Sequence, residues 1–374
     1  METIDIYNHN NHEGYNNNSI DINSLIEKLK QKLNRRSDNV YQEELEDVLK
    51  ILETTFHTKM NVVLKDGISV EWQCYGDELL NNINLLRNII DQYLNGKICS
   101  CYDKINKWWK GSKNNLGARA RLLSTSYIAK GKKFFRIRIK DDMEDFTAKD
   151  LFHVPFEKRG KIGNERYSVP GFPCLYLGTS LYICWEEMGK PALKDVVASS
   201  LQCTEDGIRL FDLRIQQTIK DKTQLENYLV ILPFIVACSI SVRKKDKDNK
   251  FKEEYILPQL LLHSIIQTSN KDYRYDGIIY TSTKSNLFFD DPSLIDNLVI
   301  PVKKAAPSGH CSTLSKWFRI TPPLYLEREM MKNPTDFTLL YSERDEYEAS
   351  IFGMAECFIK QTKPIGVNDS SNIL

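Results

Sequence analysis

The chain has 374 residues, of which 41% are hydrophobic and 27% charged, and its 51 basic and 50 acidic side chains leave a formal net charge of +1. This is the composition of a soluble globular protein long enough for two domains, and so small a charge gives no field for holding nucleic acid. No apolar run approaches the roughly 20 residues that span a bilayer, and no secretion signal is visible, so we expect a cytoplasmic protein with reduced thiols and no membrane contact.

The first third of the chain is predicted to be disordered and then helical. Residues 1–18 are rich in Asn and poor in large apolar groups, so we expect disorder there. Three segments then show apolar residues at helical spacing. These segments are 19–36, 41–56 and 77–96. With a strand-like patch at 67–72 they form a predicted helical domain over 19–125, whose apolar stripes are expected to be its core.

From about residue 130 the pattern changes to short strands mixed with helices. The strand candidates are 132–139, 174–178, 207–213, 276–282 and 297–302. One helix is predicted over 181–188, with Ser180 as its N-cap, and another over 257–267. Because strands and helices do not alternate regularly, the expected fold class is α+β over residues 130–305. Residues 306–374 are expected to form a C-terminal extension.

Arg136 lies in the apolar strand FFRIRI, on the same predicted face as Phe134 and Arg138. A guanidinium among the apolar side chains of a strand needs a planar anionic partner, and a diphosphate accepts paired hydrogen bonds from it. The sequence therefore makes Arg136 a candidate phosphate ligand. The alternative is a surface arginine on a half-exposed strand.

The loop over 155–171 mixes four cationic side chains, Arg159 and Arg166 among them, with three glycines. Cations and glycine backbone suit a ligand that carries phosphate, and the Tyr167 ring is a candidate for stacking on a base or a nicotinamide ring. The alternative is an ordinary basic surface loop, because the spacing matches no known phosphate-binding motif. No cysteine or histidine spacing in the chain predicts a metal site.

Tyr176 lies in a short strand that leads to the helix capped by Ser180, and this helix ends near Glu186 and Glu187. Carboxylates are unfavourable at the negative end of a helix dipole, and a residue placed against a local rule is sometimes functional. A carboxylate there would stabilise positive charge on a sugar whose N-glycosidic bond is breaking. The alternative is a solvated acidic pair. Ser282 ends a later strand, where its hydroxyl binds phosphate or ribose or merely finishes the strand.

In this order the landmarks resemble the RES domain, a family of NAD-consuming bacterial toxins, over roughly residues 130–305. The resemblance rests on Arg136, Arg166–Tyr167, the strand at Tyr176, then Ser180 and Glu187, and DGIIYTS ending in Ser282. The family's GRWN-type loop is here NERYS, with Ser168 in the Asn position. The chain is also about twice as long as a compact RES toxin.

The resemblance implies a fold similar to ADP-ribosyltransferase toxins, with two small sheets around a cleft for NAD⁺. It implies NAD⁺ as a substrate rather than a resident cofactor, with nicotinamide released and ADP-ribose passed to water or phosphate. Arg136 would bind phosphate, Tyr176 would pack on the ligand, and Glu187, with Glu186 as its nearest rival, would serve the ribose. Ser282 would hold phosphate or ribose. A toxin of this kind would be neutralised by a separate antitoxin.

Two other functions stay open on the sequence. One is ADP-ribosyl transfer onto a macromolecule, and the other is a non-catalytic module that senses a nucleotide while its helical region binds a partner. A homo-oligomer is also open.

Overall fold

The computed structural model describes residues 19–34, 38–57, 61–63, 69–71, 76–110, 124–140, 146–215, 219, 221–268, 274–286, 291–327 and 344–369. Helices and strands are mixed along this part of the chain, which confirms the α+β class expected from the sequence. None of the helices described is both long enough and apolar enough to cross a membrane. The predicted disordered start, residues 1–18, lies outside the described residues.

Four helices and a small three-stranded sheet form the N-terminal part of the described chain. They are α1 (Ile22–Asn34), α2 (Tyr41–His57), α3 (Gly76–Leu94), α4 (Ile98–Lys110), β1 (Ser19–Asp21), β2 (Asn61–Val63) and β3 (Ser69–Glu71). The three helices predicted from apolar spacing are present, and the strand-like patch contains β3. Leu29, Leu49 and Ile83, one from each predicted helix, are buried, as an amphipathic stripe requires.

A mixed sheet of ten strands organises the rest of the described residues. The strands are β4 (Thr125–Ile128), β5 (Lys133–Ile139), β6 (Cys174–Gly178), β7 (Val196–Cys203), β8 (Ile208–Leu213), β9 (Gly277–Thr281), β10 (Asp296–Pro301), β11 (Phe318–Ile320), β12 (Leu324–Tyr325) and β13 (Ile365–Gly366). Their order is β13-β11-β7-β5-β6-β10-β9-β8-β4, with β12 on β7. The neighbours pair antiparallel except for β8 and β9, which are parallel. All five predicted strands are present.

The sheet is most loosely joined where β5 meets β6. β5 pairs with β7 along its whole length, from Lys133 to Ile139, whereas the described ladder between β5 and β6 consists of Phe135 opposite Gly178. The resemblance implied two small sheets around a cleft for NAD⁺. The structure instead has one hydrogen-bonded sheet that is nearly divided at this junction, directly beside Arg136.

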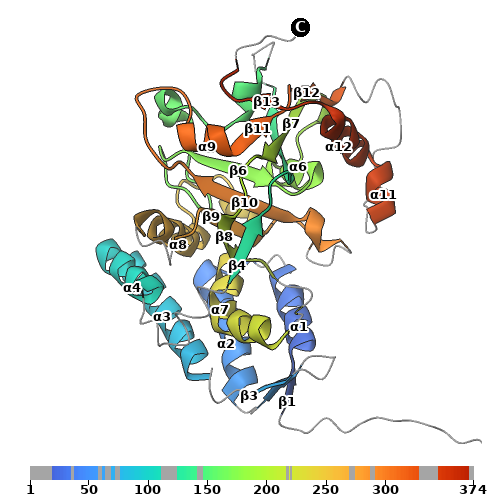
Figure 1. Ribbon diagram of the computed structural model, residues 1–374. Helices are drawn as coiled ribbons and strands as arrows, with labels where there is room; N and C mark the ends of the chain where they lie inside the picture. The colour runs from blue at the N-terminus through green and yellow to red at the C-terminus, as the bar shows by residue number, and fades with distance from the viewer. Residues whose placement is uncertain are drawn as a thin grey trace, which may run out of the picture.

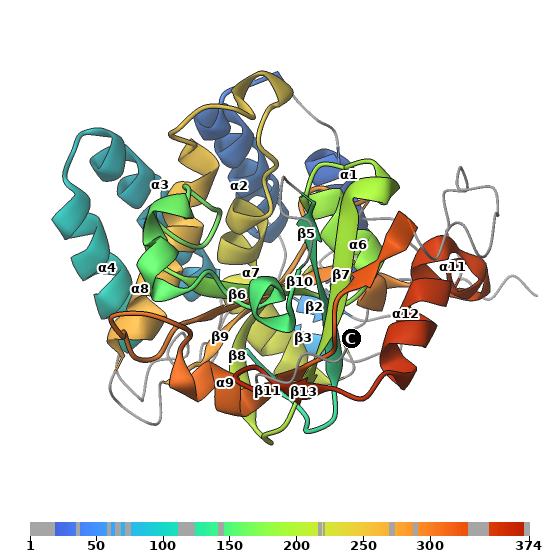
Figure 2. The same ribbon diagram turned by 90° about the horizontal axis from the view of Figure 1, so that it is seen from above.

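Helices cover the sheet on several sides. They are α6 (Leu181–Glu187), α7 (Lys222–Cys238), α8 (Ile256–Gln267), α9 (Ser312–Trp317), α11 (Arg344–Ala349) and α12 (Ile351–Gln361). Figures 1 and 2 show α3, α4 and α8 on one side of the molecule and α11 and α12 on the other. The helices predicted over 181–188 and 257–267 correspond to α6 and α8.

Helix α7 ties the N-terminal helices to the sheet. It lies with α1 and α2 beneath the sheet (Figure 1), and its residues are buried around the whole circumference. One continuous apolar core includes residues of α1 to α4, α7, α8 and the strands β8 to β10. The regions predicted as 19–125 and 130–305 therefore share a hydrophobic core.

Gly178 allows α6 to pack directly on the sheet. A Cβ at this position would lie 2.6 Å from Cys184 Sγ and 2.7 Å from Ile183 Cγ2, and both of these side chains are buried. Because close-packed interiors have little room to move, we expect Gly178→Ala to lower the free energy of unfolding by about 1–3 kcal/mol in urea denaturation. In Gly160→Ala the new Cβ meets no atom within 4 Å, so this control should change little. Equal urea midpoints for the two variants would contradict the expectation.

Candidate functional site

Glu187, the last residue of α6, is held by side chains from two strand ends. Its Oε1 accepts hydrogen bonds from Ser282 Oγ at 2.6 Å and from Asn297 Nδ2 at 2.7 Å. Lys284 Nζ lies 3.4 Å from Oε2 and donates to the main-chain carbonyl of Glu187. This cation offsets the unfavourable position of a carboxylate at the negative end of a helix. The Glu187 side chain is 29% exposed, so it is fixed in place and still accessible to a ligand.

The neighbouring Glu186 faces a different environment. Its side chain is 4% exposed, accepts a hydrogen bond from the Tyr182 hydroxyl at 2.7 Å and forms an ion pair with Lys190 at 2.8 Å. Successive helix residues point about 100° apart. The structure accordingly brings Glu187, and not Glu186, to Ser282.

Arg136 is a buried cation at the loose junction of the sheet, with 9% of its surface exposed. Its Nη1 donates to the main-chain carbonyl of Tyr176 at 2.6 Å, and its Nε has no hydrogen-bond partner among the residues described. Burial, reinforced by the Arg138 cation, lowers the pKa of the guanidinium. Within the described ranges, no ion pair joins Arg136 to a carboxylate. A buried charge in this state is costly, and an anionic ligand would reduce the cost.

Tyr176 lies between Arg136 and the loop that carries Ser168. Its carbonyl holds Arg136, and its hydroxyl lies 3.0 Å from Ser168 Oγ. Burial raises the pKa of the phenol, so it stays neutral and able to donate a hydrogen bond. The side chain is half-buried, which leaves part of it open to a ligand.

Two residues are electrostatic neighbours of both Arg136 and Glu187. They are the Cys184 thiol, on α6, and the Glu165 carboxyl, on the loop before β6. Cys184 Sγ also donates to the Phe135 carbonyl at 3.3 Å, so α6, which ends at Glu187, is attached to β5 directly beside Arg136. Since Tyr176 contacts Arg136 and Ser282 contacts Glu187, this region contains all four residues around which the sequence hypothesis was built.

The Arg166 guanidinium is engaged with main-chain and side-chain oxygens. Its Nη1 donates to the carbonyls of Cys238 and Ile240 at 3.0 and 3.1 Å, and its Nη2 donates to Thr283 Oγ1 at 3.0 Å. Thr283 follows Ser282 directly. Arg166 therefore connects the end of α7 to the turn that carries Ser282, and this is a positioning contact rather than a free phosphate ligand.

Tyr167 is placed in the core. It is 0% exposed, and its ring packs against the Tyr280 ring with centroids 4.5 Å apart. A ring without an accessible face does not stack on a ligand in this conformation. The expectation that Tyr167 stacks on a base or a nicotinamide ring is therefore wrong for this structure, because the ring is fully buried and packs against Tyr280.

Arg159 and Ser180 also have local structural contacts. Arg159 Nη1 donates to the carbonyl of Gly171 at 3.1 Å, and its guanidinium lies over the Phe156 ring, so it closes the loop on itself. Ser180 caps α6 as predicted: its Oγ accepts from the Ile183 amide at 3.0 Å. The fully buried hydroxyl therefore fixes the start of the helix that presents Glu187.

Three residues of this region were not identified from the sequence. Asn297 was assigned only to an apolar strand, although a polar side chain at the start of such a strand is a usable signal, and it pairs in register with Tyr280. Lys284 lies two residues beyond Ser282, in a polar stretch where no sequence pattern distinguishes it. Glu165 lies within the loop over 155–171, whose four cationic side chains predict a phosphate ligand and give no signal for a functional carboxyl.

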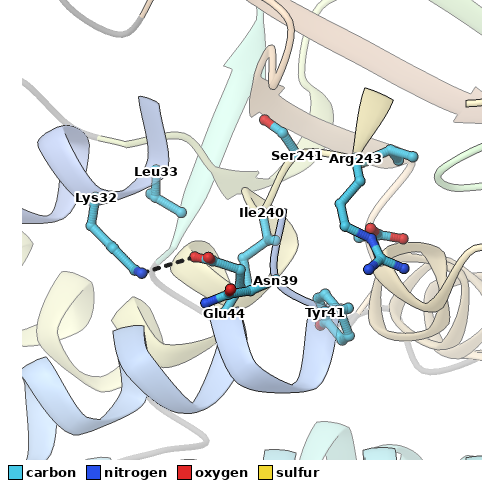
Figure 3. Close-up of a pocket in the computed structure, with 10 residues that line it drawn as sticks. Lys32, Leu33, Asn39, Tyr41, Glu44, Ile240, Ser241 and Arg243 are labelled. Carbon is cyan, nitrogen blue, oxygen red and sulfur yellow. Dashed lines mark ion pairs between the residues drawn. The ribbon is translucent and has the colours of Figure 1, made fainter. Parts of the chain in front are cut away.

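A separate small cavity lies between the N-terminal helices and residues 240–243 (Figure 3). Its lining includes Tyr41 and Arg243, and an ion pair of 3.1 Å joins Lys32 to Glu44 within it. It contains none of the predicted site residues. Ile240, which lines this cavity, accepts a hydrogen bond from Arg166 at 3.1 Å through its main-chain carbonyl.

Comparison with known proteins relates the chain to one curated protein. "Putative toxin YopC" from Bacillus subtilis (strain 168) is 34% identical over 296 residues, which cover 72% of this chain and 66% of that protein. The chain thus spans just under two thirds of the length of this relative. No family model matches the chain.

One solved structure matches at low similarity. It is the crystal structure of the M. tuberculosis MbcT-MbcA toxin-antitoxin complex, in which one chain is 11% identical with a TM-score of 0.29. The match covers 57% of this chain and 96% of that chain. A likeness this slight supports no argument about fold or function.

The Arg136 guanidinium, which forms no ion pair with the described residues, predicts an anion site that can be tested without any assay of activity. Inorganic pyrophosphate should raise the thermal unfolding midpoint of the unmodified protein, because a ligand that binds the folded state stabilises it. Arg136→Gln should lose most of this pyrophosphate-induced shift, whatever its own midpoint. Arg319→Gln, a control at an exposed position on β11, should keep it. A shift of the same size in Arg136→Gln and the control would remove Arg136 from the site.

Proposed function

We propose that this protein cleaves the nicotinamide–ribose bond of NAD⁺ and passes ADP-ribose to water or phosphate. One observation carries the proposal: a buried guanidinium that has no anionic partner among the described residues lies in the same region as a carboxylate fixed by two side-chain hydrogen bonds. NAD⁺ offers a diphosphate to the first group and a sugar that becomes cationic to the second. The resemblance of Arg136, Tyr176, Glu187 and Ser282 to the RES landmarks supports the same substrate.

Arg136 is assigned to the diphosphate. Its Nε has no hydrogen-bond partner in the part of the chain that the structure describes, and its Nη1 is anchored on the Tyr176 carbonyl, so the guanidinium plane is already oriented before a ligand arrives. Charge-assisted hydrogen bonds from arginine to phosphate are strong and directional. Tyr176, whose side chain is half-buried, is assigned to packing on the ligand.

Glu187 is assigned to the nicotinamide ribose. As the bond between C1 of the sugar and the ring nitrogen breaks, its electron pair moves to the pyridinium nitrogen, and nicotinamide leaves neutral. Positive charge develops on the sugar, and a preorganised carboxylate stabilises it. The hydrogen bonds from Ser282 and Asn297 fix one carboxylate oxygen, so the group need not reorganise during the reaction. No general acid is required for this leaving group.

The biological role proposed is that of a toxin that depletes NAD⁺. The relative that is 34% identical is named as a toxin, and loss of NAD⁺ would arrest a cell that carries the active protein. We propose accordingly that a separate antitoxin neutralises it. We also propose that the strands flanking the β5–β6 junction correspond to the two sheets of an ADP-ribosyltransferase-like fold.

Release of free nicotinamide tests the proposal. The purified protein incubated with NAD⁺ should release nicotinamide, detected by mass, and Glu187→Gln should reduce the rate by about 10²–10³-fold, because it removes the charge that stabilises the transition state. Glu186→Gln is the control, since Glu186 contacts Tyr182 and Lys190 outside the site and should leave the rate nearly unchanged.

Other outcomes would replace the proposal with a different function. If labelled ADP-ribose appears on a macromolecule, the protein is a transferase. If nucleotide binds tightly without turnover and Glu187→Gln binds it equally well, the protein is a sensing module. Equal rates for Glu187→Gln and Glu186→Gln would remove Glu187 from the reaction.

A further inference from the structure

Glu165 sits on a loop whose backbone is fixed from several directions. Its amide donates to the Ser168 carbonyl at 3.0 Å, and the Ser168 amide donates back to the Glu165 carbonyl at 3.3 Å. The same Glu165 carbonyl accepts from Gln259 Nε2 at 2.9 Å. The main chain of Glu165 is thus immobilised, while the residue as a whole keeps an exposed surface.

The flanking residues attach this loop to the candidate site on both sides of Glu165. Arg166 binds the Thr283 hydroxyl, next to Ser282, and Ser168 contacts the Tyr176 hydroxyl. Since residues one and three positions further along the chain both contact the site, Glu165 lies beside it.

Three of the four charges that act on Glu165, those of Lys284, Glu187 and Arg136, belong to the candidate site. Lys284 and Lys252 attract its carboxylate, Glu187 repels it, and Arg136 attracts it. Desolvation by the surrounding protein atoms is the main cause that raises the pKa of the carboxyl, although the residue as a whole keeps an exposed surface. Raising the pKa of a carboxyl makes its ionised form a better proton acceptor.

Glu165 and Glu187 therefore have different chemical environments. Glu187 Oε1 already accepts two hydrogen bonds and Oε2 faces Lys284, so its negative charge is held in place. Among the described residues, no side chain donates a hydrogen bond to the Glu165 carboxylate. Two nearby carboxylates in unlike environments are suited to two separate tasks.

We propose that Glu165 is the general base of this site and directs the reaction to water rather than to phosphate. The inference rests on the proposed cleavage of NAD⁺. A water molecule forms a bond from its oxygen to C1 of the ribose as the bond to nicotinamide breaks, and the proton of that water passes to Glu165. ADP-ribose and neutral nicotinamide are the products, and Glu165 then releases the proton to solvent.

The same carboxylate disfavours phosphate as the acceptor. Phosphate is already anionic at neutral pH, so its attacking oxygen needs no base, and a negative Glu165 beside the ribose repels it. Water is neutral, gains from a base and meets no repulsion. Glu165 is therefore a determinant of acceptor choice as well as a catalytic group.

Product partition tests this assignment. The unmodified protein, Glu165→Gln and the control Glu205→Gln are incubated with NAD⁺ and inorganic phosphate, and ADP-ribose is resolved from ADP-ribose 1-phosphate by mass. Glu205 is exposed in the turn between β7 and β8. Glu165→Gln should lose hydrolysis by about 10²-fold or more and should shift its products towards the phosphorylated sugar. Glu165→Asp keeps a carboxylate and should recover part of the hydrolysis.

The possible failures of the two proposals are distinct. If the unmodified protein releases no nicotinamide, the proposed function itself fails. If it does release nicotinamide and Glu165→Gln gives the same rate and the same ratio of products as Glu205→Gln, only the role of Glu165 is overturned. A drop in both products of Glu165→Gln by the same factor, without recovery in Glu165→Asp, also overturns it, because a merely structural role would lower both together.

Discussion

The candidate site depends on one interaction, the anchoring of the Glu187 carboxylate by Ser282 and Asn297. The three residues come from the end of α6, the end of β9 and the start of β10, so the hydrogen bonds form only when the helix and both strands are assembled. Gly178 permits the close approach of α6, Ser180 fixes where that helix begins, and Lys284 compensates the charge at its end. Much of the local architecture therefore serves to hold a single carboxylate in a defined position.

The second constraint on the site is the burial of the Arg136 cation at the junction of β5 and β6. Strand β5 pairs along its whole length with β7 but barely with β6. At the β5–β6 junction the Arg136 guanidinium binds the Tyr176 carbonyl. Its burial without an ion pair to any described residue costs stability, and residues that cost stability are often retained for binding or chemistry. The N-terminal helices are linked to the same region through α7 and Arg166, whose contacts run from the Cys238 carbonyl to Thr283.

The sequence predicts some elements of this arrangement and not others. Apolar periodicity identified α1, α2 and α3, and capping residues identified α6, because these signals are local. Strand β7 was not predicted, since Ala198, Ser199 and Ser200 interrupt its apolar pattern, and α7 was not predicted because a helix buried on all sides has no polar face. The order of Arg136, Tyr176, Glu187 and Ser282 was readable as a motif. The contacts of Asn297 and Glu165 were not, because they depend on strand register and loop anchoring between residues far apart in the chain.

The most direct measurement is a crystal structure of the slow variant Glu187→Gln with NAD⁺ bound. We expect a diphosphate oxygen within hydrogen-bond distance of the Arg136 guanidinium, and the nicotinamide ribose beside position 187. NAD⁺ bound elsewhere, for instance against the cavity between the N-terminal helices and residues 240–243, with Arg136 untouched, would contradict it.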